Sequence, residues 1–191
     1  MEVLMFKRMR GFTLIELLIV VAIIGILAAL LIPNAITAIQ KAKQKSTMKD
    51  INTMSTGCAD YITDHGNWDA VAQDGQLDTN NAFMAAIAPF YVKILPRADG
   101  WGEPYYAYVG ETAVEGNSAI TSLESGDVGE DDFVCASAGR DNELEGFGFD
   151  EADPETGFYE LNALSDFALD LVQWSGSWVR APRIARAVTG T

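Results

Sequence analysis

Hydrophobic and polar positions are distributed very unevenly along this chain. Sixteen consecutive residues, from Leu17 to Ile32, carry no polar side chain. The apolar run extends back to Phe12, and only Thr13 and Glu16 interrupt it. As an α-helix, the twenty-one residues from Phe12 to Ile32 would be roughly 30 Å long, which matches the hydrocarbon thickness of a bilayer. The pattern predicts a membrane-spanning helix close to the N-terminus.

After Pro33 the pattern changes to that of an amphipathic helix. Apolar residues recur at spacings of three and four, which place them on one helical face: Ile36, Ile39, Met48, Ile51, Met54, Cys58 and Tyr61. Gly66 is a typical residue at a helix end, so we expect one helix from about Leu14 to about Asp64. His65 then caps the helix end and has no catalytic role.

The rest of the chain predicts a small head of short strands and loops. We expect a short helix between Asn67 and Ala88, within a loop. Alternating or apolar runs bounded by turn residues predict strands at Tyr105–Val109, Phe133–Ala136, Leu171–Trp174 and Trp178–Arg180. The expected fold is α+β, with three or four antiparallel strands packed on the second half of the long helix.

Charge and composition exclude several classes of function. Acidic residues outnumber basic ones 27 to 13, which gives a formal net charge of −14. An acidic surface repels phosphate, so we expect no nucleic-acid partner. One histidine and two cysteines provide neither a multi-histidine metal centre nor a four-ligand zinc site. Carboxylates are abundant, but no pair is distinguished as acid and base, so we expect no enzymatic activity.

Glu16 is the anomalous residue of the apolar segment. A carboxylate at the centre of a membrane helix costs about 2.5–3.5 kcal/mol and is functional by default. Residues 1–11 form a basic leader with Lys7, Arg8 and Arg10. A cleavage after Gly11 would remove this leader and create an α-amino group at Phe12. The carboxylate of Glu16 in one subunit would then meet the Phe12 ammonium of another and fix the register between packed helices. A secretory signal is the alternative, but its apolar core is shorter and ends at a small-residue cleavage site.

The segment KRMRGFTLIELLIVVAIIGILAALLIPNAITA closely resembles the N-terminus of type IV pilins and type II secretion pseudopilins. The resemblance implies that prepilin peptidase cleaves between Gly11 and Phe12 and methylates Phe12, and that Glu16 is needed for methylation and subunit recruitment. It also implies that the stretch from Gly25 to Pro33 kinks, or melts as subunits enter the filament. A gentle kink of a membrane helix is the alternative, since Pro33 removes one backbone hydrogen bond.

The same resemblance implies a division of the chain and a location for each part. Residues 1–11 are the leader, 12–33 the transmembrane and filament-core helix, and 34–65 the helix half that packs on the head. Residues 66–180 form the globular head and 181–191 a tail. The protein would lie in the bacterial inner membrane with its head in the periplasm, and then in a homopolymer. An inner-membrane assembly platform with a motor ATPase would drive polymerisation.

Two segments of the head resemble those of major secretion pseudopilins. LPRADGWGEPYYAY is similar to a Trp-containing loop of that family, in which we expect Trp101 to fill the core between helix and sheet. Ser137, Gly139 and Asp141, together with Asp170, match the residues around a calcium loop. The resemblance implies a structural Ca²⁺ held by Asp141, Asp170 and the carbonyl of Ala138. A solvated acidic loop is the alternative interpretation.

Cys58 lies on the predicted helix face, and Cys135 lies in a strand that we expect to pack on it. In an oxidising periplasm they could form a disulfide; two buried thiols are the alternative.

Three hypotheses for function follow. The first is a structural subunit of a type II secretion pseudopilus or a closely related filament. The second is a surface type IV pilin acting in adhesion, motility or DNA uptake. The third, from another class, is a membrane-anchored periplasmic binding protein, in which Met1 stays uncleaved.

Overall fold

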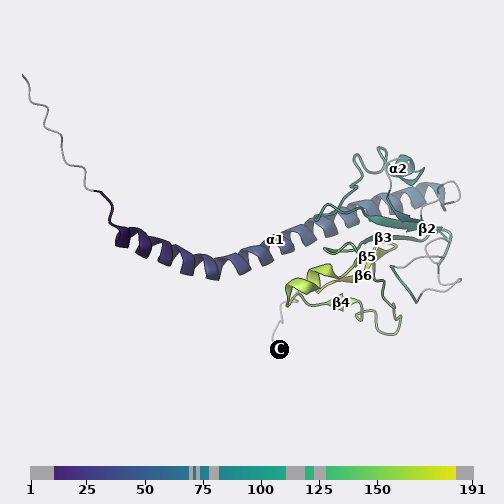
Figure 1. Ribbon diagram of the computed structural model, residues 1–191. Helices are drawn as coiled ribbons and strands as arrows, with labels where there is room; N and C mark the ends of the chain where they lie inside the picture. The colour runs from purple at the N-terminus through teal and green to yellow at the C-terminus, as the bar shows by residue number, and fades with distance from the viewer. Residues whose placement is uncertain are drawn as a thin grey trace, which may run out of the picture. The chain divides into compact units, whose positions relative to one another are not determined.

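The computed structural model describes residues 11–68, 71, 74–77, 82–110, 119–122 and 128–183 (Figure 1). The chain divides into two compact units, one ending at Ile39 and the other beginning at Gln40. The elements are α1 (Leu14–His65), β1 (Asp74–Gln76), α2 (Ala82–Ile87), β2 (Tyr106–Val109), β3 (Phe133–Ser137), β4 (Phe158–Tyr159), the 3₁₀ helix η2 (Leu164–Ala168), β5 (Leu171–Trp174) and β6 (Ser177–Pro182).

Helix α1 runs without interruption through the first unit and on into the second, which confirms the predicted long helix. Every large apolar side chain between Leu14 and Ile32 is at least 46% exposed. Gly25 and Pro33 both lie inside the continuous helix. The first part of α1 is therefore a helix without a protein core around it, and its length and composition suffice to cross a membrane. The functional kink or melting at Gly25 and Pro33 stays a prediction.

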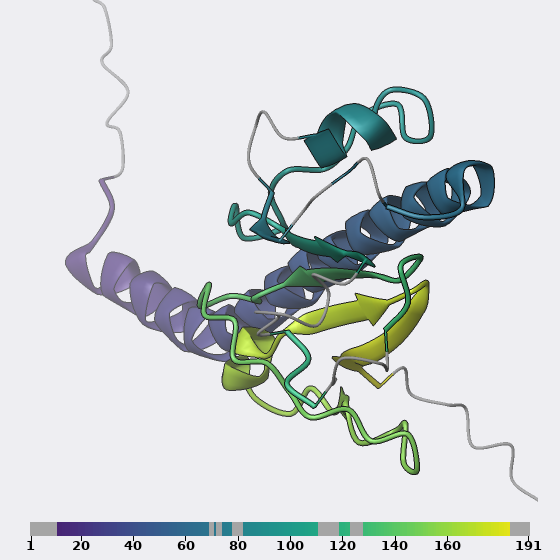
Figure 2. The same cartoon turned by 90° about the vertical axis from the view of Figure 1, so that its right-hand side faces the viewer.

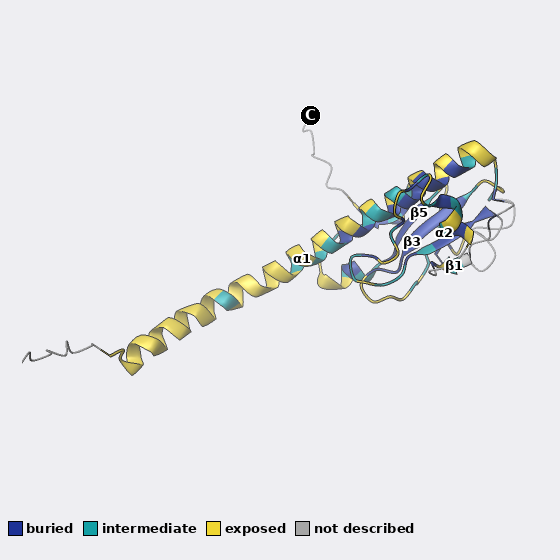
Figure 3. Cartoon of the chain, turned by 90° about the horizontal axis from the view of Figure 1, so that it is seen from above, coloured by how far each residue is buried: buried dark blue, intermediate teal, exposed yellow. Residues whose placement is uncertain are grey.

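In the second unit, one face of α1 is buried and the opposite face is exposed (Figure 3). The buried residues follow helical spacing and are partly polar: Gln44, Thr47, Ile51, Met54, Ser55, Gly57, Cys58 and Tyr61. The small residues among them allow the head to approach the helix closely. At Gly57, for example, an added Cβ would overlap the side chain of Val92.

The described strands form one sheet in the order β1-β2-β3-β5-β6-β4, which lies across the C-terminal part of α1 (Figure 2). The predicted strands at β2, β3, β5 and β6 are confirmed. The predicted count of three or four strands was too low, because β1 and β4 span three and two residues and are too short to show alternation. Strand β4 also pairs in parallel with β6, whereas the remaining pairs are antiparallel.

Strands β5 and β6 form a hairpin that turns on two residues, Ser175 and Gly176. Both have positive φ, 43° at Ser175 and 88° at Gly176. This is the combination of a type I′ turn, whose twist matches that of the paired strands. Strand β6 continues through Ala181 and Pro182, the first two residues of the predicted tail. Residues 184–191 lie outside the described part of the chain.

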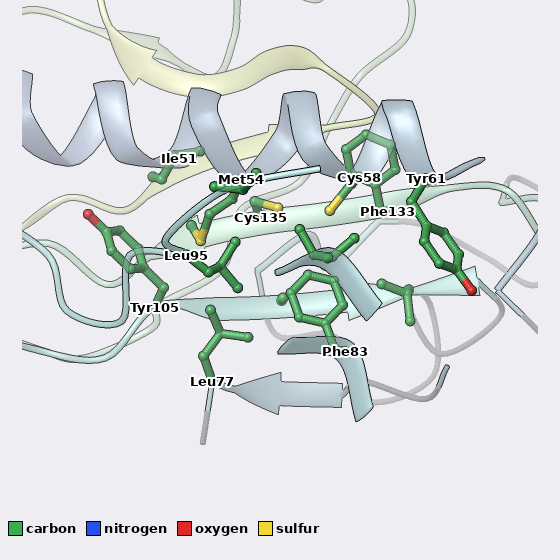
Figure 4. Packing of buried hydrophobic residues seen from close by; sticks show 14 of the residues in the cluster. Ile51, Met54, Cys58, Tyr61, Leu77, Phe83, Leu95, Tyr105, Phe133 and Cys135 are labelled. Atoms are coloured by element: carbon green, nitrogen blue, oxygen red, sulfur yellow. The ribbon is translucent and has the colours of Figure 1, made fainter. Parts of the chain in front are cut away.

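Two apolar clusters lie on opposite faces of the sheet. The cluster beneath α1 contains Met54 and Cys58 from the helix, Cys135 from β3 and Phe83 from α2 (Figure 4). Val134, the neighbour of Cys135 in β3, belongs instead to the second cluster. Alternation of side chains along a strand has this effect, and all of β3 is buried as a result.

The loop between α2 and β2 fastens α1 to the sheet. The Asp99 carboxylate accepts hydrogen bonds from the backbone N–H groups of Trp101, Gly102 and Glu103, at 2.8–3.0 Å. Its other oxygen accepts the hydroxyl of Ser137 on β3, at 2.8 Å. The next residue, Gly100, donates its N–H to Thr47 Oγ1 of α1 at 2.9 Å. One acidic side chain thus ties the loop to the sheet while the adjoining backbone contacts the helix.

Trp101 has a different role from the predicted one. Its ring is half-buried at the edge of the head and does not fill the core. The indole Nε1 donates to Gln40 Oε1 of α1 at 2.7 Å. The fully buried aromatic residue of this segment is Tyr105. An indole N–H needs a polar partner when it is buried, and at the edge of the head a helix side chain provides one.

We predict that Gly100→Ala destabilises the head. A Cβ at this position would lie 2.5 Å from the carbonyl oxygen of Lys43, so the loop and helix would have to separate. We expect the free energy of unfolding to fall by about 1–3 kcal/mol. Chemical denaturation of the full-length protein in detergent, followed by tryptophan fluorescence, measures it.

Gly148→Ala is the matched control, because no atom lies within 4 Å of its Cβ position. We expect it to stay within about 0.5 kcal/mol of the unmodified protein. Equal stability of the two variants would contradict the close approach of loop and helix.

Candidate functional site

The expected cleavage bond lies just before the helix. Residues 11–13 have no regular secondary structure, and α1 begins at Leu14. Gly11 is exposed, and the side chain of Phe12 is 81% exposed. A peptidase needs an accessible, non-helical backbone, and the Gly11–Phe12 bond meets that condition.

Thr13 and Glu16 close the first turn of α1 by bonding to each other. Glu16 Oε2 accepts the backbone N–H of Thr13 at 2.9 Å and its hydroxyl at 2.7 Å. In return, the N–H of Glu16 donates to Thr13 Oγ1 at 3.3 Å. This reciprocal arrangement is a capping box, which satisfies backbone donors that a helix start leaves unpaired.

The capping box was missed from the sequence, although its signal was present. A threonine followed three residues later by glutamate, just before an apolar run, is the signature of this motif. The motif gives Glu16 a second role beside the predicted one. Within a single chain its carboxylate is already hydrogen-bonded, which lowers the cost of placing it at the end of an apolar segment.

The carboxylate of Glu16 has no ion-pair partner among the described residues. Both hydrogen bonds from Thr13 end on Oε2, so the other oxygen is available to a further donor. The ammonium group that cleavage would create at Phe12 is such a donor. Its pairing with Glu16 of another subunit stays a prediction, because a single uncleaved chain does not test it.

The residues expected around a calcium ion lie on two neighbouring connections of the head. Asp141 follows β3, is exposed, and accepts the N–H of Glu143 through Oδ1 at 3.2 Å. Asp170 precedes β5 and is fully buried. Its Oδ2 accepts the N–H groups of Glu145 and Gly146 at 3.1 and 3.0 Å.

Asp170 Oδ1 is the feature of this region that fits a cation. It is buried and has no hydrogen-bond partner. Burial raises the pKa of Asp170 to about 6, although nearby Arg180 acts in the opposite direction. The Arg180 guanidinium is itself engaged by the carbonyl of Gly146 at 3.1 Å and by Glu145 at 3.7 Å. A buried carboxylate oxygen without a donor is favourable only when a proton or a cation is nearby.

The described residues hold no group of three or more metal-binding side chains. A calcium site here would therefore draw most of its six to eight oxygen ligands from backbone carbonyls and water. Gly139 allows the chain to pass close to this point, because an added Cβ would lie 2.6 Å from the carbonyl oxygen of Ala168. The residues fit a carbonyl-rich site anchored by Asp170.

Cys58 and Cys135 are both buried free thiols in this structure. Their sulfur atoms point toward each other across the contact between α1 and β3 (Figure 4). Burial raises the pKa of the Cys58 thiol, and the neighbouring Cys135 raises it further. A thiol held protonated is a poor nucleophile. The pairing stays a prediction.

His65 ends α1 and packs among aromatic rings. Its ring stacks on Tyr61 at 4.1 Å between centroids, and its Nδ1 lies 3.1 Å from the carbonyl oxygen of Tyr61. These contacts agree with a helix-end role.

A long N-terminal helix with an exposed apolar half, an accessible bond before its first turn, and a carboxylate in that turn define a pilin-like protein. The family model for the prokaryotic N-terminal methylation motif matches residues 6–32. The chain is 34% identical to type II secretion system core protein G of Aeromonas hydrophila over 105 residues, covering 52% of this chain and 72% of that protein. The chain belongs to the family of type II secretion system core protein G.

Two other relatives show how far the similarity extends. Core protein G of Escherichia coli is 31% identical over 103 residues, covering 51% of this chain and 70% of that protein. Type IV major pilin protein PilA of Myxococcus xanthus is 42% identical over 67 residues, covering 35% of this chain and 30% of that protein. No solved structure matches this chain.

We predict that Thr13→Val frays the first turn of α1 while Thr13→Ser preserves it. Valine cannot accept the N–H of Glu16 or donate to its carboxylate, and loss of an N-cap costs about 1 kcal/mol. The amides of Glu16 and Leu17, which donate to Thr13, should therefore exchange with solvent about fivefold faster. Hydrogen exchange of the full-length protein in detergent micelles measures this, and equal rates in the two variants would contradict the capping box.

Proposed function

We infer that this chain is a structural subunit of a type II secretion pseudopilus or a closely related filament, made as a precursor and processed by prepilin peptidase. The observation that carries this proposal is the arrangement at the start of α1. An accessible Gly11–Phe12 bond, a carboxylate at Glu16 and an exposed apolar helix follow one another within a matched methylation motif. We propose no enzymatic activity for the chain.

In this proposal the apolar half of α1 has two successive environments. It spans the inner membrane first, with the head in the periplasm, and then packs against the same segment of other subunits. Cleavage removes three basic residues and one acidic residue, which leaves a formal side-chain charge of −16. The new Phe12 ammonium then lies at the end of a helix otherwise without a basic residue before Lys41.

Glu16 selects the correct register during assembly. A carboxylate brought into an apolar bundle next to an ammonium is paired, whereas one shifted by a turn is buried alone. Removing one partner of a buried ion pair costs about 3–5 kcal/mol. A packing arrangement that leaves Glu16 without an ammonium is therefore strongly disfavoured. An inner-membrane assembly platform with a motor ATPase would supply the work of extraction.

A surface type IV pilin is the second candidate, supported by the similarity to PilA. The similarity to core protein G extends over a longer part of this chain, 105 residues against 67. This difference favours the pseudopilus. Shearing of cells separates the candidates, because surface pili appear in the supernatant and short periplasmic filaments do not.

We predict that Glu16→Gln abolishes filament assembly without preventing membrane insertion. Glutamine retains the hydrogen bonds of the capping box but cannot pair with an ammonium. Filaments should fall below about a tenth of the unmodified level, since a lost buried ion pair exceeds 1.4 kcal/mol. Electron microscopy of sheared or detergent-extracted filaments counts them, and mass spectrometry of the N-terminal peptide reports cleavage and methylation at Phe12.

An intact Met1 in the unmodified protein would overturn this function and favour an anchored binding protein. Normal filaments in Glu16→Gln would instead contradict only the role of the charge.

We further propose that a structural Ca²⁺ binds at Asp170, with Asp141 and the carbonyl of Ala138 as additional ligands. The buried and unpartnered Oδ1 of Asp170 supports this proposal. The ion would supply the positive charge that this oxygen lacks and would hold together the connections after β3 and before β5.

We predict that Ca²⁺ raises the melting temperature of the full-length protein in detergent and that chelator lowers it again. Asp170→Asn should abolish this response. In chelator the variant should be at least as stable as the unmodified protein, because it buries an amide in place of a charge. Asp153→Asn, which changes an exposed carboxylate between β3 and β4, is a control that should keep the calcium response. Equal melting with calcium and with chelator would end the proposal.

A further inference from the structure

Three lysines form a stripe along α1 immediately after its apolar half. Lys41, Lys45 and Lys49 follow one another at intervals of four residues, which places them on one side of the helix. All three are exposed, whereas Gln44 and Thr47 on the face toward the sheet are buried. We refer to these three residues as the lysine stripe. Lys43 is half-buried near Gly100 and is not part of it.

The lysine stripe forms no ion pair with any other residue that the structure describes. Neither of the two ion pairs in the described part of the structure involves these lysines. The three lysines are exposed, and Figure 3 shows that this part of α1 has an exposed face beside its buried one. Its positive charge is therefore available to a partner outside the chain.

The overall charge of the protein makes such a partner necessary in a polymer. Each subunit carries a formal side-chain charge of −16 after cleavage. Strongly charged copies that pack side by side repel each other. Of the thirteen basic residues in the chain, three are in this stripe, and they offset the repulsion only if they lie next to acidic residues of another copy.

A matching acidic segment is exposed in the connection between β3 and β4. Asp150, Glu151, Asp153 and Glu155 supply four carboxylates within six residues, and all four are exposed. We refer to these residues as the acidic segment. Within the described residues only Glu155 forms an ion pair, at 3.5 Å from Arg183. Three carboxylates of the segment are thus free of cationic partners there.

We propose that the lysine stripe of one subunit binds the acidic segment of a second copy of this chain. The inference rests on the proposed filament function and names a contact that holds neighbouring heads together. Each copy carries both surfaces, the lysine stripe and the acidic segment. A contact between two unlike surfaces can be heterologous, so it can repeat from copy to copy along an open helical assembly.

Anionic lipid is the other partner that the charge of the stripe would fit, and the geometry disfavours it. At a rise of 1.5 Å per residue, Lys49 lies about 12 Å beyond Lys41 along the helix. The headgroup layer on each side of a bilayer is only about 5–8 Å thick. Lipid headgroups would contact Lys41 but leave the far end of the stripe unpaired.

Zero-length cross-linking of filaments assembled in the host bacterium tests the contact. A carbodiimide activates a carboxylate, which the lysine amine then attacks; an amide bond forms and the activating group leaves as a urea. We expect covalent dimers whose digests contain a peptide with Lys41, Lys45 or Lys49 joined to the acidic segment. Filaments that yield cross-linked dimers without this joint would overturn the proposal.

Substitution of the stripe tests whether the contact supports assembly. We expect the combined change of Lys41→Gln, Lys45→Gln and Lys49→Gln to lower filament yield about tenfold, because three surface pairs are lost together. Lys93→Gln is the control, since Lys93 is an exposed lysine outside the stripe. Reversal of the stripe to glutamate should stop assembly, and reversal of Asp150, Glu151 and Asp153 to lysine in the same chain should restore it.

The outcomes separate this proposal from the proposed function. Unmodified protein that keeps Met1 and forms no filaments would contradict the function itself. Unmodified protein that assembles, together with a triple Gln variant that assembles equally well, would overturn only the contact. Loss of binding to phosphatidylglycerol vesicles by that variant, with filament yield unchanged, would assign the stripe to lipid and would also overturn it.

Discussion

The structure depends on one constraint, which is that a single helix must be stable in two different surroundings. In its first part α1 presents apolar side chains on all sides and has no core of its own. In its second part it buries one face against the sheet and exposes the other. Side-chain burial in a protein core stabilises only the second part, whereas the first gains its stability from lipid or from other helices. The functional proposals for this protein all follow from that division.

Polar contacts at two places along α1 have different effects. At its start, the capping box between Thr13 and Glu16 satisfies backbone donors that no protein neighbour reaches. Where the helix meets the head, the backbone at Gly100 contacts Thr47, and the Asp99 carboxylate fixes that backbone to the sheet through Ser137. The first device leaves a carboxylate ready for a charge from another subunit. The second contact holds α1 and the sheet together through the loop between α2 and β2.

Charge is the property that links the head to assembly. A strongly acidic protein stays soluble but resists packing with its own copies. The lysine stripe and the acidic segment give the chain two surfaces of opposite sign that form no ion pair with each other in the described structure. Together with Glu16, they place electrostatic contacts both in the apolar bundle and among the heads. In the proposed filament, these contacts would fix the register between neighbouring helices and also between neighbouring heads. A purely apolar helix bundle would allow the helices to slide along each other.

The sequence alone determined the long helix, its exposed apolar half and the four longer strands. Each leaves a local signal, such as a run of apolar residues, a helical spacing or a strand bounded by turns. Strands β1 and β4 could not be predicted from the sequence. They have only three and two residues, which is too short for alternation to be visible, and their pairing depends on residues far away in the sequence. Tertiary structure also decided three polar contacts: the bond from Trp101 to Gln40, the bond from Ser137 to the Asp99 carboxylate, and the absence of a partner for Asp170 Oδ1 among the described residues. Whether a polar side chain finds a partner depends on residues brought together from separate elements, and sequence spacing does not record those distances.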